Sequence, residues 1–200
     1  MPSITMEARQ VFRARGGILR TREALESGIH PRTLYAMRHS GELERRARGV
    51  YRLADMPPLS NPDLAMVGTR VPQGVVCLIS ALAFHDLTTQ IPHLVHLALP
   101  RNTRTPKLDH PPLQVYRFST EAFNTGVETH TIEGIDVRVY SPEKTLADCF
   151  KYRNKIGLDV AIEALRSYRR RRGARLQRVL EFARVCRVEA VIRPYLEASV

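Results

Sequence analysis

Residues 28–41 read GIHPRTLYAMRHSG, and this stretch predicts a tight turn followed by a short helix. Gly28 suits the turn because it has no Cβ atom, and Pro31 suits the first position of a helix. His30 is a candidate for the residue that caps this helix, and Gly41 is expected to end it. The stretch is therefore the second half of an expected helix-turn-helix.

The segment before the turn predicts two more helices and a short strand. The first helix has one apolar stripe with helical spacing and ends at a pair of glycines. We expect Thr21 to cap the second, short helix, Ala24 and Leu25 to form its inner face, and Ile29 to anchor the turn after it. The stripe is Ile4, Ala8, Val11 and Phe12, the glycines are Gly16 and Gly17, and the strand is Ile18 and Leu19.

Two short strands follow the third helix. They cover residues 43–46 and 50–53, and a glycine-containing turn at 47–49 joins them. A hairpin in this position is the wing of a winged helix-turn-helix domain, which we place at residues 1–54.

The third helix has one apolar and one polar face. At 100° per residue, Leu34 and Met37 point to the core. The second helix of such a pair enters the major groove of DNA, where arginine can bind guanine with two hydrogen bonds. We therefore predict that the opposite face binds base edges, and that the wing binds phosphates or the minor groove. The candidate DNA-binding residues are Arg32, Thr33, Tyr35, Ala36 and His39 on the helix and Arg45, Arg46 and Arg48 on the wing.

The charge of the chain favours a negatively charged partner. Its 200 residues contain 31 Lys and Arg against 20 Asp and Glu, a net charge of +11. Residues 1–53 carry +6 and residues 151–178 carry +8, whereas residues 54–150 carry −3. Such basic zones attract polyanions, including nucleic acids. Two other interpretations stay open, because small winged domains also serve as protein-interaction modules and an arginine-rich face can simply be solvated.

Other features exclude several classes of protein. The longest stretch without charge, residues 71–85, is shorter than the roughly 20 residues of a membrane span. Since the amino terminus has no signal-peptide pattern either, we expect a cytoplasmic protein with no membrane partner. His93 and His96 would point to opposite faces of a strand, so we expect no metal site and no cofactor. The three cysteines, expected to be buried thiols, are Cys77, Cys149 and Cys186.

The chain is predicted to be α+β, with a second domain after a linker. Residues 55–62 contain three prolines, which discourage both helix and strand. The domain that follows, residues 63–200, is predicted to be mixed α/β with a helical carboxy-terminal end. Its expected strands are 75–79, 94–99, 113–118 and a hairpin at 127–140 that turns at Glu133 and Gly134. One helix is expected to begin at Pro62, and two more are expected to follow Ser80 and Ser141, which act as their caps. Three further helices are expected at 157–168, 176–185 and 188–196.

No catalytic constellation stands out, so we expect that the chain is not an enzyme. It has no P-loop and no GxGxxG, GxSxG or HExxH motif. The best set for a nuclease is Asp136, Glu143 and Lys144, but the last two are adjacent at a helix start and diverge by about 100°. We interpret them as capping and dipole partners, and Asp148 and His85 as polar groups at helix ends. A DNA-associated nuclease stays the less favoured alternative.

The densest charge in the chain is a run of four arginines. Because Gly173 follows it, we expect the run to span the end of one helix and the next loop. It is a candidate contact for DNA beside the main site, for an RNA or for an acidic protein, and a solvated role fits equally well. The residues are Arg169, Arg170, Arg171, Arg172 and Arg175.

Several segments, taken in order, resemble the AbiEi-type antitoxins, a family of AbiE-like transcriptional regulators of bacteria. The segments span about residues 5–168 and so cover both predicted domains. The run YSPEKTLAD at 140–148 is the most family-like. The others are GIL at 17–19, GIHP at 28–31, GEL at 41–43, RGVYRL at 48–53 and SALAFHDL at 80–87.

The resemblance implies one half of a two-gene toxin–antitoxin module connected with abortive infection and phage defence. The winged helix of such a protein binds inverted repeats in its own operator DNA and represses the operon. The carboxy-terminal domain counteracts a nucleotidyltransferase-type toxin encoded next door, often without a stable complex, and has no active site. A stand-alone DNA-binding regulator is the alternative. This chain departs from typical members in its short end after residue 168 and in its arginine run.

Overall fold

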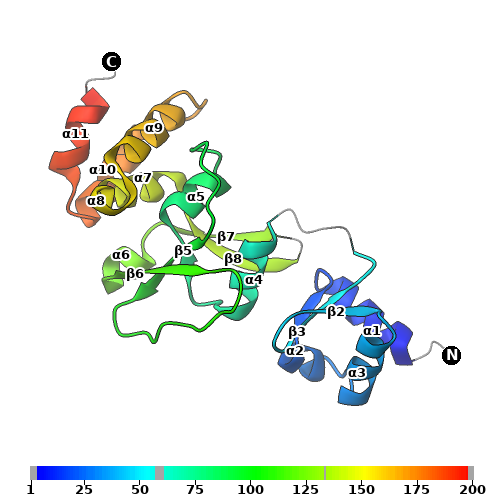
Figure 1. The fold of residues 1–200 in the computed structure, drawn as a ribbon. Helices are drawn as coiled ribbons and strands as arrows, with labels where there is room; N and C mark the ends of the chain where they lie inside the picture. The colour runs from blue at the N-terminus through cyan, green and yellow to red at the C-terminus, as the bar shows by residue number, and fades with distance from the viewer. Residues whose placement is uncertain (1–3, 57–60, 133, 198–200) are drawn as a thin grey trace. The chain divides into compact units, whose positions relative to one another are not determined.

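The structure of the chain is a computed structural model that describes residues 4–56, 61–132 and 134–197. The chain divides into two compact units, and the fold is α+β, as predicted (Figure 1). Unit one contains residues 1–72 and 130–137, and unit two contains residues 73–129 and 138–200. Part of the predicted linker, residues 57–60, and the predicted turn residue Glu133 lie outside the described residues. None of the described helices is long and apolar enough to cross a membrane.

Unit one begins with the helices and the three-stranded sheet of a winged helix-turn-helix. Its elements are α1 (Ile4–Ala14), β1 (Ile18–Arg20), α2 (Thr21–Glu26), α3 (Pro31–His39), β2 (Leu43–Ala47), β3 (Val50–Leu53) and α4 (Pro62–Arg70). The sheet is antiparallel with the order β1-β3-β2, so that Tyr51 of the central strand lies opposite Leu19 on one side and Arg45 on the other.

One apolar cluster holds the first three helices against this sheet. Phe12 has no exposed surface, and Leu34 and Met37 are each 1% exposed. Burying a side chain of this size stabilises a fold by about 2 kcal/mol. The stripe predicted on α1 is confirmed at Ala8 and Phe12 and is wrong at Ile4, which is 70% exposed. The first turn of α1 lies beyond the cluster, whose members on this helix begin at Ala8.

The second helix differs from the prediction in its cap and its inner face. Arg20 is the N-cap residue, and its amide N–H donates to the carboxylate of the glutamate three residues later. Thr21 is the first helical residue, and its backbone N–H and its hydroxyl both donate to the carbonyl oxygen of Gly49. Ala24 is buried as predicted, but Leu25 is 41% exposed. The two residues are adjacent and point about 100° apart around the helix axis, so the side of α2 that packs inward buries only Ala24.

The second sheet has five strands in the order β6-β5-β4-β8-β7. The elements are β4 (Val75–Val76), α5 (Leu78–Phe84), β5 (Val95–Pro100), β6 (Leu113–Phe118), α6 (Thr120–Asn124), β7 (Val127–Ile132) and β8 (Ile135–Tyr140). Strand β4 pairs antiparallel with β5 and parallel with β8, and β5 pairs parallel with β6. The predicted mixed sheet is thereby confirmed.

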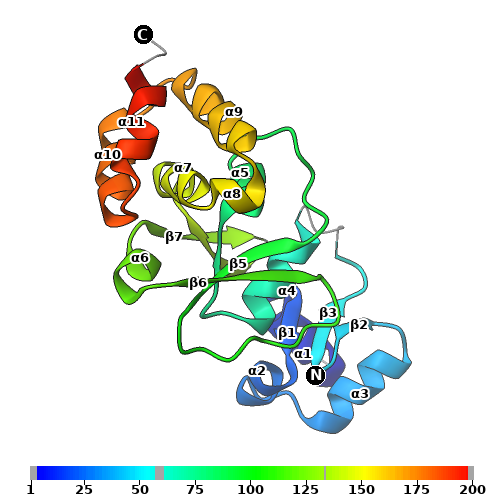
Figure 2. The same ribbon diagram turned by 60° about the vertical axis from the view of Figure 1, so that its left-hand side comes forward.

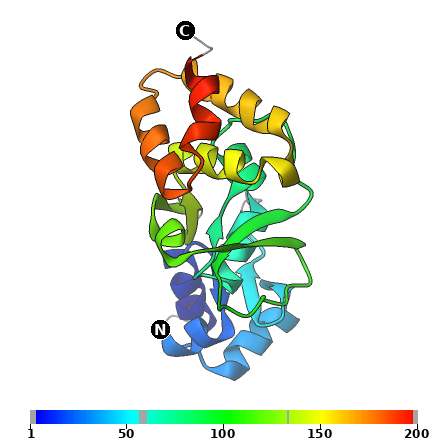
Figure 3. The same cartoon turned by 90° about the vertical axis from the view of Figure 1, so that its left-hand side faces the viewer.

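Five helices complete unit two, and the ribbon views show them gathered at its carboxy-terminal end (Figures 2 and 3). They are α7 (Pro142–Lys151), α8 (Arg153–Ile156), α9 (Leu158–Arg169), α10 (Leu176–Val185) and α11 (Glu189–Glu197). Helix α7 lies in their middle, in contact with α5, α9 and α10. As predicted, Ser141 caps α7, accepting the backbone N–H of Lys144 at 3.3 Å.

The amino-terminal part of unit two corrects two predictions. The strand expected at 75–79 ends after two residues, because Cys77 is the N-cap residue of α5. Ser80 therefore lies inside α5 rather than before it, and its hydroxyl oxygen accepts the backbone N–H of His96 at 2.9 Å. A short apolar run fits a buried helix as well as a strand, which explains the error. The short helices α6 and α8 were not predicted, whereas all three cysteines are buried free thiols, as expected.

Candidate nucleic-acid interface

The local sequence defines where α3 begins. Gly28 has φ +86°, a left-handed conformation that side chains with a Cβ atom rarely adopt, while the space around it is open. The backbone conformation, not crowding, therefore calls for glycine. His30 is the N-cap residue, and its Nδ1 atom accepts the backbone N–H of Arg32 at 3.2 Å, while Pro31 is the first helical residue. Both predictions for this helix start are confirmed.

Helix α3 has one buried and one exposed face. Leu34 and Met37 pack into the apolar cluster of unit one. On the opposite face, Tyr35 is 49% exposed, and the Nδ1 atom of His39 lies 2.8 Å from the carbonyl oxygen of Tyr35, which orients the imidazole ring. Of the candidate residues on α3, Arg32, Tyr35, Ala36 and His39 are exposed, and Thr33 is half-buried.

The wing formed by β2 and β3 contains a bulge. The register of the two strands shifts between Arg45 and Ala47, so Arg46 is the extra residue. A bulge bends its strand and turns the side chain at that position in a new direction. Arg45, Arg46 and Arg48 are all exposed. Arg46 lies 3.5 Å from Glu44, and a surface pair of this kind contributes at most about 1 kcal/mol, so it leaves Arg46 available to a ligand.

Some arginines of this unit serve its own fold instead. Arg9 and Arg13 of α1 donate to the same oxygen of Asp55 at 2.6 and 2.7 Å. The hydrogen bond from Arg13 is the main reason why the pKa of Asp55 lies below its ordinary value. Within the described part of the chain, the guanidinium groups of Arg32 and Arg48 have no such carboxylate. Arg32 and Arg48 thus add unpaired positive charge to α3 and the wing.

Two further arginines belong to this surface or support it, and sequence reasoning missed both. Arg38 of α3 is exposed, and its place three residues after Tyr35 could have indicated that it borders the same face. Arg70 of α4 donates to the carbonyl oxygen of Arg48 at 2.6 Å, which fixes the turn of the wing. No local signal could have found this contact, because the two residues are 22 positions apart.

Comparison with known proteins places this geometry in a family. Residues 6–54 match the family described as transcriptional regulator, AbiEi antitoxin. The amino-terminal domain is therefore similar to the AbiEi antitoxin family over these residues. The match runs from α1 through β3 and contains every candidate residue of α3 and the wing. For this AbiEi-type domain the resemblance found in the sequence is confirmed.

The fold of the chain also resembles a solved structure. The crystal structure of the RV2827C protein from Mycobacterium tuberculosis matches with a TM-score of 0.54 and 15% sequence identity, over 98% of this chain and 82% of that chain. Similarity at this level of identity shows a shared fold alone. No curated protein matches the chain.

The residues considered for a nuclease have structural partners. Glu143 and Lys144 are 1% and 0% exposed. The Oε1 atom of Glu143 accepts the hydroxyl of Tyr168 at 2.8 Å, and the Nζ atom of Lys144 lies 2.5 Å from Asp148. Glu143 lies in the first turn of α7, as expected of a partner of the helix dipole, but both side chains are buried. Asp136, the third candidate, lies exposed on β8.

The two remaining polar candidates had been assigned to helix ends, and only one of them lies there. His85 is the C-cap residue of α5, with Nε2 2.7 Å from the carbonyl oxygen of Tyr140. Asp148 instead lies within α7 and has no exposed surface, so its assignment to a helix end is wrong. Burial raises the pKa of Asp148, while Lys144 and the thiol of Cys186, which donates at 3.1 Å, oppose that rise.

The arginine run divides into two groups. Arg169 donates to the carbonyl oxygen of Leu196 at 2.9 Å. Arg171 donates to the carbonyl oxygens of His85 and Asp86. Arg175 donates from Nε to Glu143 at 2.9 Å. These three connect the end of α9 and the loop after it to α11, α5 and α7. The other two, Arg170 and Arg172, are exposed.

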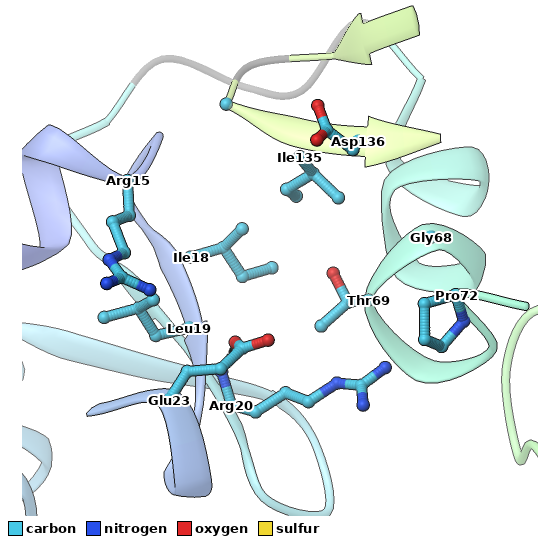
Figure 4. A pocket seen from close by; sticks show the side chains of 11 residues that line it. Arg15, Ile18, Leu19, Arg20, Glu23, Gly68, Thr69, Pro72, Ile135 and Asp136 are labelled. Carbon is cyan, nitrogen blue, oxygen red and sulfur yellow. Dashed lines mark hydrogen bonds between the residues drawn. The ribbon is translucent and has the colours of Figure 1, made fainter. Parts of the chain in front are cut away.

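Unit one also contains a pocket, shown from close by in Figure 4. Side chains of both charges line it, so it favours no single class of ligand. The lining residues are Arg15, Ile18, Leu19, Arg20, Glu23, Gly68, Thr69, Pro72, Gly134, Ile135 and Asp136. Across the described ranges, no group of three or more His, Cys, Asp or Glu side chains could hold a metal ion.

Proposed function

We propose that this chain is an antitoxin that represses its own operon by binding inverted repeats in its operator DNA. The observation that carries the proposal is the exposed face of α3, with Arg32, Tyr35 and His39, in the same domain as a wing with three exposed arginines. The DNA-binding domain is residues 1–54. Membership of this domain in a family of transcriptional regulators supports the proposal.

Each candidate residue has a stated role in this proposal. Arg32 binds guanine through two hydrogen bonds in the major groove. Tyr35, His39, Thr33 and Ala36 contact other base edges or thymine methyl groups. Arg45, Arg46 and Arg48 bind phosphates or enter the minor groove, which adds affinity without reading sequence.

The second part of the proposal concerns residues 63–200, which follow the linker at 55–62. We propose that this region counteracts a nucleotidyltransferase-type toxin encoded beside the antitoxin gene, without requiring a stable complex, as part of phage defence. The segments at 80–87 and 140–148 carry the resemblance that supports this role. Arg170 and Arg172, the exposed members of the arginine run, remain candidate contacts for a partner. The alternative is a stand-alone transcriptional regulator of the cytoplasm.

Binding to the upstream DNA of the gene tests the first part. Fluorescence anisotropy at about 150 mM salt should show roughly thousandfold tighter binding to this duplex than to a shuffled one. Arg32→Ala should reduce this preference by about ten- to a hundredfold, the value of one bidentate base contact. Arg22→Ala is the matched control, because Arg22 is exposed on α2 and pairs with Glu26. Equal binding to both duplexes would refute the proposal.

Co-expression tests the second part. The neighbouring gene product should arrest growth when expressed alone and should be neutralised by residues 63–200. A neighbouring gene without toxicity, together with intact operator binding, would favour the stand-alone regulator.

A further inference from the structure

The outward face of helix α9 carries four charged side chains, and the described residues provide few of them with partners. Its inward face packs into the core of unit two through Val160, Ala161, Ala164, Leu165 and Tyr168. The outward face lines a hollow that is formed by this helix alone. The lining residues are Asp159, Ile162, Glu163, Arg166, Ser167 and Arg170.

The charges on this outward face are separated by sign. Asp159, Glu163, Arg166 and Arg170 follow one another at spacings of four, three and four residues, so they lie within about 60° around the helix axis. The acidic pair occupies the amino-terminal half of the helix and the basic pair the carboxy-terminal half. In the described part of the chain, the structure pairs neither arginine with a carboxylate. The hydroxyl of Thr89 donates to Glu163 at 3.3 Å.

This face is complementary to itself. A two-fold axis at the level of the midpoint between Ala164 and Leu165 exchanges residues that are equally far from that midpoint along the helix. It places Asp159 opposite Arg170 and Glu163 opposite Arg166. The same axis places Ile162 opposite Ser167, so all six lining residues form symmetric pairs.

We propose that a second copy of this chain docks on this face, with the two α9 helices antiparallel. Each copy then contributes two carboxylates and two arginines, and the contact contains four ion pairs. An isologous contact of this kind requires one patch to be self-complementary, and this face meets that requirement. The phosphates of a nucleic acid fit the face less well, because Asp159 and Glu163 repel them.

The association is weak in solution and sensitive to salt. Helix α9 has 12 residues and is about 18 Å long, so the contact is smaller than the roughly 800 Å² per partner of a stable complex. Exposed ion pairs contribute little each and are screened by ions. Two copies bound to adjacent half-sites of one duplex raise each other's effective concentration, and the contact then makes binding cooperative. This last step rests on the proposed function.

Charge reversal in the full chain tests the proposal. One variant combines Asp159→Arg with Glu163→Arg, and a second combines Arg166→Glu with Arg170→Glu. Sedimentation at low salt should show self-association weakened at least about tenfold in each, because all pairs become repulsive. An equimolar mixture of the two variants should associate more strongly than the wild-type chain. A chain with all four substitutions should associate about as well as wild type, because every pair is restored with its signs exchanged.

A matched control separates this contact from net charge. Arg178→Glu with Arg187→Glu changes the charge by the same amount as the second variant, at exposed positions outside α9. It should leave self-association within about twofold of wild type. Affinity of the wild-type chain for a single half-site tests the proposed function separately, because absence of that binding would refute the proposed function and not this contact. A wild-type chain that is monomeric up to about 500 μM and binds paired half-sites without cooperativity overturns the proposal. Lower affinity of the second variant for a random duplex, with unchanged self-association, would assign the face to nucleic acid instead.

Discussion

The Nζ atom of Lys144 lies 2.5 Å from the Oδ2 atom of Asp148, one turn later in α7, and neither side chain has exposed surface. The ammonium group also lies 4.2 Å from the ring centroid of Tyr140 and 4.9 Å from that of Phe118, and aromatic faces attract cations. Charges removed from water are tolerated only when each compensates the other. The family-like segment at 140–148 therefore contributes a buried polar pair to the core of unit two.

Breaking this pair should destabilise unit two. Lys144→Met or Asp148→Leu alone should lower its free energy of unfolding by about 3–5 kcal/mol, because the remaining charge is buried without its partner. The double variant should lose less than the two single losses combined. Urea unfolding followed by circular dichroism measures these values. Arg193→Ala on the surface of α11 is the control and should cost at most about 1 kcal/mol. Additive losses would contradict a coupled pair.

The free energy of unfolding should fall as the pH is lowered, because His96 on β5 is buried. This imidazole is 8% exposed and lies 3.2 Å from the hydroxyl of Ser80, and burial lowers its pKa to about 4. In the unfolded chain the pKa is about 6.5. The folded state therefore disfavours the protonated ring. The stability that this lowered pKa contributes is complete above about pH 6.5, and on the order of 3 kcal/mol of it is lost as the pH falls towards 4.

Urea unfolding at several pH values between about 7 and 5 tests this expectation. The variant His96→Gln should lose less stability over this interval than the wild-type chain. Parallel pH curves for the two proteins would show that His96 is protonated equally in both states.

The turn before α3 should be sensitive to a single methyl group. Gly28→Ala should destabilise unit one by about 1–2 kcal/mol, because the left-handed φ of +86° is unfavourable for alanine. The open space around this position excludes a clash as the cause. Thermal unfolding measures the loss. An unchanged melting temperature for Gly28→Ala would show that the turn has another conformation in solution.

The wing and α3 should contribute differently to operator binding, if the proposed function holds. Replacing Arg45, Arg46 and Arg48 together by alanine should lower the slope of log affinity against log salt by up to about 2.7, or about 0.9 for each phosphate that the wing no longer binds. The ratio between native and shuffled duplex should change little. Arg32→Ala should do the reverse. An unchanged salt slope in the triple variant would exclude the wing from phosphate binding.

Local signals were sufficient to predict the helix-turn-helix of the amino-terminal domain. Three features at the start of α3 depend only on residues within a few positions. They are the left-handed turn at Gly28, the cap at His30 and the first helical position at Pro31. Leu34 and Met37 follow a 3.6-residue period, which identifies the buried face of a helix without knowledge of its neighbours. These features made the helix-turn-helix and its exposed face predictable.

The partners of the polar side chains in unit two could not be predicted, because they come from distant segments of the chain. Glu143 meets Arg175, 32 residues later, and this contact makes a helix-start glutamate a buried partner of another helix. Ser80 was expected to cap a helix, but the backbone of His96 holds its hydroxyl instead. Charge alone also could not separate Arg171, which binds the end of α5, from the exposed Arg170, since their neighbours in sequence are alike. Turns, caps and periodic faces are encoded within one or two helical turns, whereas burial of a polar side chain is decided by which distant residues the fold brings to it.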